Sequence, residues 1–130
     1  MKTILVDAVD GLVVETPNGF EIFKEMHALL ETFPNPKIIL TGADDEQYKT
    51  FGLDHMPYEV FTLKHNPEKT DPKYFELMLA HFGLKPDEVV YFEHNPRAVK
   101  SAEKLQIVSY HYDPEKRDLT KLKNFLASNL

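Results

Sequence analysis

The sequence predicts an α/β fold in which a mostly parallel five-stranded sheet carries helices on both faces, forming a three-layer sandwich. Two observations predict it. Short apolar runs of strand length alternate along the chain with stretches whose apolar residues recur at helical spacing. The connecting segments are short, and strict alternation with short connections favours parallel strands joined by right-handed crossovers. We therefore expect a Rossmann-like arrangement of the elements.

The five predicted strands are apolar runs bounded by turn signals. The first ends at Asp7 and is unbroken and apolar, which predicts a buried strand near the centre of the sheet. The third alternates between polar and apolar residues, which is typical of a less buried strand. In chain order, the runs are 2–6, 37–40, 58–63, 89–92 and 107–110.

Five helices are predicted between and after these strands, and a short extended piece at 12–16 follows the first strand. The third helix has the clearest ends, because Asp71 is a good N-terminal cap, Pro72 suits the first helical position and Gly83 suits the C-terminal cap. In chain order, the predicted helices are about 19–33, 44–51, 72–82, 98–105 and 119–126. We interpret residues 1–130 as one core domain without a cap domain.

The composition excludes several classes of function. An apolar fraction of 42% supports a packed core, and the absence of cysteine excludes disulfides, thiolate zinc sites and a cysteine nucleophile. A formal net charge of −6 argues against a nucleic-acid surface. No apolar run approaches the roughly 18 residues of a membrane span, and the N-terminus lacks the apolar core of a signal peptide. We therefore expect a cytoplasmic protein with neither a nucleic-acid nor a membrane partner.

Chemically useful side chains follow several of the predicted strands. Asp7 ends the first strand, Thr41 the second, and Glu93 the fourth, while Lys69 lies in the loop that precedes the third helix. The carboxyl ends of parallel strands meet at one edge of a sheet, so these side chains should face one crevice. Carboxylates bind Mg²⁺, a lysine and a hydroxyl can hold phosphoryl oxygens, and an aspartate can attack phosphorus.

From about residue 2 to residue 110, the sequence resembles the haloacid dehalogenase-like (HAD) superfamily. The superfamily's first motif is an apolar strand followed by Asp-x-Asp-Gly-Thr, which places Asp7 at its nucleophile. Thr41 falls on the Ser/Thr of the second motif, and Lys69-Thr70-Asp71-Pro72 resembles the Lys-Pro-Asp-Pro of the third. The segment 87–96 with the helix after it resembles the fourth motif.

The resemblance implies a hydrolase that cleaves a phosphate ester through an aspartyl-phosphate on Asp7, with Mg²⁺ as cofactor. The implied substrate is a phosphorylated small molecule or macromolecule, and a capless member could close its site by forming a homo-oligomer. The implied catalytic residues are Asp7, Asp10, Thr41 and Lys69; the substrate contacts are Thr41, Gly42 and Lys69; the metal ligands are Asp7, the carbonyl of Val9, Glu93 and His94.

The first and fourth motifs depart from the family pattern. Val9 stands two residues after Asp7, where phosphatases of the family have the aspartate that protonates the leaving group. Asp10 lies three residues after Asp7, so it replaces that acid only if the strand end is bulged. The family's dehalogenase and phosphonatase branches also lack this aspartate. His94 is a poorer ligand for magnesium than for a transition metal.

Structural roles compete with these functional ones. Asp7 could form a turn, Thr41 could cap the following helix, and Lys69 could be solvated, with Lys64 as the alternative site lysine. Outside the fourth motif the sequence shows no cluster around its loop histidines, among them His65.

Two other functional readings remain. The departures favour a catalytically degenerate protein that acts as a binding or interaction module. A phosphorylatable receiver domain fits the length but not the order of its motifs, because a receiver carries its acceptor aspartate after the third strand, where this chain has Lys64.

Overall fold

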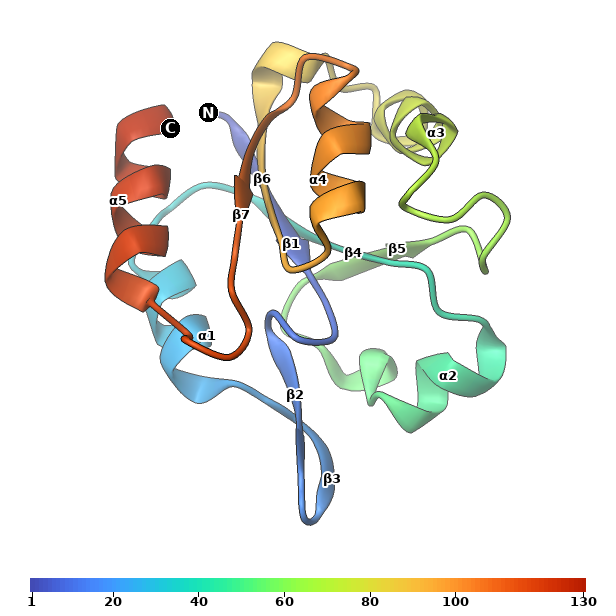
Figure 1. Ribbon diagram of the computed structural model, residues 1–130, viewed down its shortest axis with the longest axis vertical. Helices are drawn as coiled ribbons and strands as arrows, with labels where there is room; N and C mark the ends of the chain where they lie inside the picture. The colour runs from blue at the N-terminus through green and yellow to red at the C-terminus, as the bar shows by residue number, and fades with distance from the viewer.

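The computed structural model describes all residues from 1 to 130 and confirms the α/β architecture (Figure 1). Five parallel strands form the main sheet in the order β5-β4-β1-β6-β7. Their bounds are β1 Thr3–Asp7, β4 Lys37–Thr41, β5 Glu59–Thr62, β6 Val89–Glu93 and β7 Val108–His111. The first strand is central and all five of its residues are buried, as its unbroken apolar run predicts.

Helices cover both faces of this sheet. Their bounds are α1 Lys24–Glu31, α2 Asp45–Thr50, α3 Pro72–Phe82, α4 Pro96–Glu103 and α5 Leu119–Asn129. Alternate residues of β1 point to opposite faces, so Ile4 and Val6 pack with α1 and α5, while Leu5 packs with α3 and α4. Figure 1 shows these two helix pairs on opposite sides of the strands.

The ends of α3 follow the sequence signals. The side chain of Asp71 accepts a hydrogen bond of 2.9 Å from the backbone N–H of Lys73, and Pro72 is the first helical residue. Gly83 ends the helix in the left-handed conformation, with φ of 65°. These caps fix the start of the helix directly after the loop that carries Lys69.

The predicted helix over 19–33 is wrong in its first third. Gly19–Ile22 forms β3, which pairs antiparallel with β2 (Val13–Thr16), and the helix begins only at Lys24. Gly19 adopts φ of 107°, and the Thr16 hydroxyl donates to its carbonyl at 2.9 Å. This tight turn pairs the two arms as a hairpin, which overrides the helical spacing that begins at Ile22.

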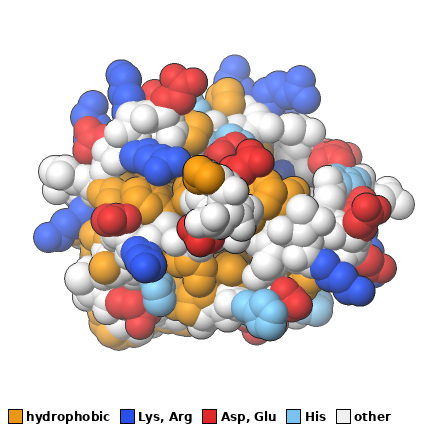
Figure 2. Space-filling model, turned by 90° about the horizontal axis from the view of Figure 1, so that it is seen from below, with side chains coloured by type: hydrophobic (Ala, Val, Ile, Leu, Met, Phe, Trp, Pro, Cys, Tyr) orange, Lys and Arg blue, Asp and Glu red, His pale blue; other side chains and the backbone are white.

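The β2–β3 hairpin projects from the body of the molecule beside α2, where Phe20 meets Phe51 with ring centroids 4.8 Å apart. Seen from the hairpin's side, the surface carries hydrophobic side chains among scattered acidic, basic and histidine side chains (Figure 2). The longest helices of the chain have 11 residues, so none has the length that a membrane crossing requires.

Candidate functional site

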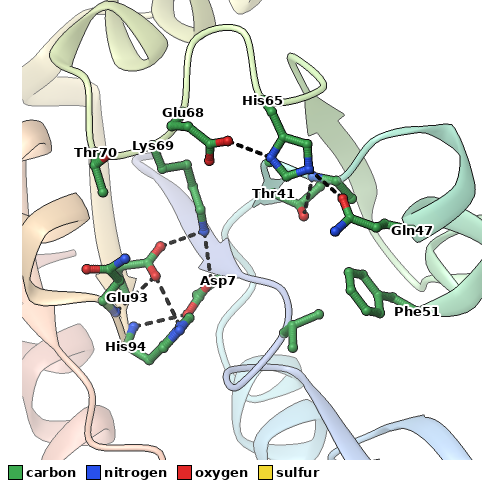
Figure 3. A pocket seen from close by; sticks show the side chains of 14 residues that line it. Asp7, Thr41, Gln47, Phe51, His65, Glu68, Lys69, Thr70, Glu93 and His94 are labelled. Carbon is green, nitrogen blue, oxygen red and sulfur yellow. Dashed lines mark hydrogen bonds and ion pairs between the residues drawn. The ribbon is translucent and has the colours of Figure 1, made fainter.

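A pocket of about 190 Å³ opens at the carboxyl edge of the sheet. Its walls come from the ends of β1, β4 and β6, from α2 and from the loop between β5 and α3, as Figure 3 shows. The lining residues are Asp7, Val9, Thr41, Gly42, Ala43, Gln47, Phe51, His65, Glu68, Lys69, Thr70, Glu93, His94 and Asn95. The structure thus brings together the strand-end residues that the sequence singles out.

Asp7 is buried at the end of the central strand, with 1% of its side chain exposed. The chain turns sharply after it, and the backbone N–H of Leu12 donates to the Asp7 carbonyl at 3.0 Å. A Cβ on Gly11 would lie 2.5 Å from that carbonyl oxygen, so only glycine fits there. Gly11, the second residue of the Asp10-Gly11 pair, therefore lets the backbone turn closely around Asp7.

The Lys69 ammonium links the two buried carboxylates of the pocket (Figure 3). Its Nζ lies 2.9 Å from Asp7 Oδ1, 2.6 Å from Glu93 Oε1 and 3.3 Å from the Leu40 carbonyl oxygen. Burial alone would lower the pKa of Lys69, but the two carboxylates outweigh it and raise that pKa. Lys69 is therefore a fixed cation with three acceptors for its three N–H groups.

Glu93 is fully buried, yet each of its oxygens has donors. Tyr91 donates its hydroxyl proton to Oε1, and the backbone N–H of Asn95 donates to Oε2 at 3.1 Å. Burial opposes ionisation, but Lys69 outweighs it and holds the pKa of Glu93 well below its usual range. Burial and the charge of Glu93 instead raise the pKa of Asp7. Of the two carboxyl groups, Glu93 is thus the one that ionises more readily.

His94 completes the cluster. Its Nδ1 lies 2.5 Å from Asp7 Oδ2 and 3.1 Å from Glu93 Oε2, and its backbone N–H donates to the same Asp7 oxygen at 3.0 Å. Its hydrogen bonds with Asp7 and Glu93 raise the pKa of the imidazole to about 10. The pocket therefore sets two basic side chains, Lys69 and His94, against the two carboxyl groups of Asp7 and Glu93.

The opposite wall carries a second polar cluster that the sequence does not reveal. His65 Nδ1 lies 2.6 Å from Glu68 Oε1, and its Nε2 lies 2.5 Å from Gln47 Oε1 (Figure 3). The prediction that His65 has no partners is wrong. Its one sequence signal is the three-residue spacing to Glu68, because Gln47 lies 18 positions away and reaches it only through the fold.

The remaining predicted residues divide between the pocket and the surface. Thr41 lines the pocket, and its hydroxyl oxygen accepts from the Ala43 backbone N–H at 3.2 Å, which leaves its own proton free to donate. Lys64 points outward to Asp45, with 60% of its side chain exposed. Of the two candidate lysines, only Lys69 therefore lies in the pocket.

Val9, which stands at the position of the missing acid, and Asp10, which could replace that acid, lie in different places. Val9 lines the pocket, so the position two residues after the buried aspartate offers no proton there. Asp10 adopts φ of 68° and is not among the lining residues. Its carboxylate is 54% exposed and lies 3.8 Å from His94 Nε2, on the outer side of the imidazole.

Three of the four predicted metal ligands also meet, since one donor atom each from Asp7, Glu93 and His94 lies within 4.8 Å of the others. The two carboxylates suit Mg²⁺ chemically. The His94 nitrogen, however, stands between their facing oxygens, and the other two oxygens contact Lys69. As they lie, these residues do not fit a magnesium ion.

The fold is an α/β sandwich of the HAD-like kind, with an aspartate at the carboxyl end of the central strand. The chain is similar in structure to a HAD family enzyme from Bacteroides thetaiotaomicron, solved as an aspartate-to-alanine variant with magnesium and inorganic phosphate. The TM-score is 0.74 at 12% identity, and the match covers 94% of this chain and 98% of that one.

Two further structures show the same fold. A conserved haloacid dehalogenase-like protein of unknown function from Agrobacterium tumefaciens matches with TM-score 0.60 and 17% identity, over 85% of this chain and 63% of its own. An uncharacterised protein from Corynebacterium glutamicum matches with TM-score 0.59 and 14% identity, over 98% of this chain and 96% of its own. The sequence matches no family model and no curated protein. This chain therefore has the HAD-like fold that its motifs predict.

Proposed function

We propose that this protein hydrolyses a phosphate ester through a covalent aspartyl-phosphate on Asp7. One observation carries the proposal: a buried carboxylate lies at the carboxyl end of the central strand, lines an open pocket and is held by Lys69 at 2.9 Å. The inorganic phosphate bound by the Bacteroides enzyme of the same fold supports this choice of substrate class. The substrate would be a phosphorylated small molecule or a phosphorylated group on a macromolecule.

In the first step, an Asp7 oxygen attacks phosphorus, and the bond from phosphorus to the leaving oxygen breaks with its electron pair on that oxygen. Asp7 Oδ1 accepts one hydrogen bond, from Lys69, whereas Oδ2 accepts two from His94. Oδ1 is therefore the freer nucleophile. In the second step, water attacks the phosphorus of the aspartyl-phosphate, releases inorganic phosphate and restores the carboxylate.

The side chain of Val9 gives this pocket a preference among leaving groups. It supplies no proton where the leaving oxygen would depart, and a missing general acid typically costs about 10²–10⁴-fold in rate. An aryl or acyl phosphate needs little protonation as its bond breaks, because its leaving oxygen is weakly basic. We therefore propose substrates of this kind rather than alkyl phosphates.

A second candidate function is a binding module without turnover, and one observation favours it. Both oxygens of Asp7 and all three N–H groups of Lys69 already have partners within the protein. A ligand must displace one of these contacts before Lys69 can touch a phosphoryl oxygen. This arrangement would also suit a fold that has lost its nucleophilic chemistry.

The experiment compares release of p-nitrophenol from p-nitrophenyl phosphate by wild type, Asp7→Asn and Asp10→Asn. Asp10 is a matched control because it is a nearby but exposed aspartate outside the pocket lining. We expect activity in wild type and Asp10→Asn and none in Asp7→Asn. Equal background rates from all three proteins would contradict the proposed hydrolysis. If wild type also binds inorganic phosphate tightly, the result would favour a binding module without turnover.

A further inference from the structure

The side chain of His94 occupies the space where a metal ion would join the two buried carboxylates. Its Nδ1 lies 2.5 Å from Asp7 Oδ2 and 3.1 Å from Glu93 Oε2. The two distances suit an Nδ1–H that donates to both carboxylates, because an unprotonated nitrogen would turn its lone pair toward theirs. The imidazole of His94 thus bridges Asp7 and Glu93, the two carboxylates that the sequence predicts as ligands of Mg²⁺.

The carboxylate oxygens of Asp7 and Glu93 are also occupied by hydrogen bonds, which leaves little room for an ion. Glu93 Oε2 accepts from Asn95 N–H, Glu93 Oε1 accepts from Tyr91 and Lys69, and Asp7 Oδ1 accepts from Lys69. Magnesium requires oxygens at about 2.0–2.1 Å in near-octahedral geometry. Each of the four oxygens instead already faces a hydrogen-bond donor of the protein.

The backbone holds the imidazole in this position. The His94 N–H donates to Asp7, and its carbonyl accepts from His111 Nε2 at 2.9 Å. The next residue, Asn95, caps α4 by accepting from the Arg97 N–H at 3.0 Å. His94 therefore lies on a turn anchored on both sides, and its ring is 30% exposed.

We propose that the Nδ1–H of His94 takes the place between Asp7 and Glu93 that a divalent cation would hold, so that the pocket holds its anionic ligand without a metal ion. His94 is a positioning residue in this arrangement: it fixes Asp7 Oδ2 and leaves Oδ1 toward Lys69. The identity of the anionic ligand rests on the proposed function. The proposal that no metal ion binds here does not rest on the proposed function, because metal binding is measured without any turnover.

The test is metal binding by EDTA-treated, dialysed protein, measured by calorimetry and by the thermal unfolding midpoint with MgCl₂, MnCl₂ or ZnCl₂. We expect no binding at this site in wild type, so that Asp7→Asn leaves the titration unchanged. His94→Ala should gain saturable magnesium binding that wild type lacks, seen as a calorimetric isotherm and as an upward shift of the unfolding midpoint with MgCl₂. The control His55→Ala, at an exposed histidine, should gain none.

Saturable binding of any of these ions by wild type that Asp7→Asn abolishes would overturn the proposal. With zinc or manganese, that result would mean that Nδ1 is itself a ligand. Failure of His94→Ala to gain affinity would also overturn it, because His94 would then not be what excludes the ion. If His94→Ala does not fold, His94→Asn replaces it. A slowly exchanging Nδ1–H signal in the ¹⁵N spectrum of wild type provides a second readout.

Discussion

Replacing Lys69 with methionine tests the charge arrangement of the pocket. The Lys69 side chain is 14% exposed, and its ammonium contacts two carboxylates that are almost completely buried. Removing one partner of a buried ion pair leaves an uncompensated buried charge and typically costs about 3–5 kcal/mol. That loss is a large fraction of the roughly 5–15 kcal/mol that stabilises an ordinary domain. We therefore expect Lys69→Met to lower the free energy of unfolding by about 3–5 kcal/mol at pH 7.

Urea unfolding followed by circular dichroism measures this change. The matched control is Lys64→Met, since Lys64 lies 2.9 Å from Asp45 but is 60% exposed, and an exposed pair is worth about 0–1 kcal/mol. Adding Glu93→Gln to Lys69→Met should recover part of the loss, because it removes a buried carboxylate that has lost its cationic partner. A loss from Lys69→Met no larger than that from Lys64→Met would refute the buried charge cluster.

Three further predictions concern single side chains. Because the folded pKa of His94 is raised to about 10 from 6.5, its stabilising contribution is complete below pH 6.5 and is lost as the pH rises toward 10. The difference in unfolding free energy between wild type and His94→Gln should therefore shrink over that range in urea titrations, and a constant difference would contradict it. The buried hydroxyl of Tyr112 has no hydrogen-bond partner, so Tyr112→Phe should raise the unfolding free energy by about 1 kcal/mol. Tyr91→Phe should lower it, because the Tyr91 hydroxyl donates to Glu93. Equal losses of unfolding free energy in the two variants, measured by urea titration, would refute this. Val9→Asp places an acid in the pocket lining. Measured as phosphate release, it should speed hydrolysis of an alkyl phosphate relative to p-nitrophenyl phosphate by up to about 10²–10⁴-fold. An unchanged ratio of the two rates would show that the leaving group is not protonated from this position.

The sequence predicts the sheet and the gathering of the strand-end residues because both follow from local patterns. Buried parallel strands read as unbroken apolar runs, as β1 and β6 do. Once those strands are parallel, their carboxyl ends share one edge, so Asp7 and Glu93 must lie near each other. The caps of α3 are equally local, and the structure confirms both.

The hairpin and the second polar cluster depend on contacts that the sequence does not show. The apolar residues Phe20 and Ile22 suit either a strand or the start of a helix, and the turn at Gly19 decides between them. His65 lies in an irregular loop without periodicity, so its approach to Gln47 emerges only when that loop folds over α2.

The role of His94 could not be predicted for a related reason. The sequence places a histidine at a metal-binding position, but whether its nitrogen faces an ion or replaces one depends on the turn between β6 and α4. That turn is set by the contacts of His94 with Asp7 and with His111, which lie 87 and 17 positions away.

The central claim is that Asp7 is a nucleophile, and intact-mass spectrometry of acid-quenched protein after mixing with p-nitrophenyl phosphate tests it most directly. We predict a phosphoryl adduct that maps to the peptide containing Asp7, forms in EDTA and is absent from Asp7→Asn while present in Asp10→Asn. Phosphate release by wild type and Asp7→Asn at the same rate, with no adduct on either protein, would contradict the account.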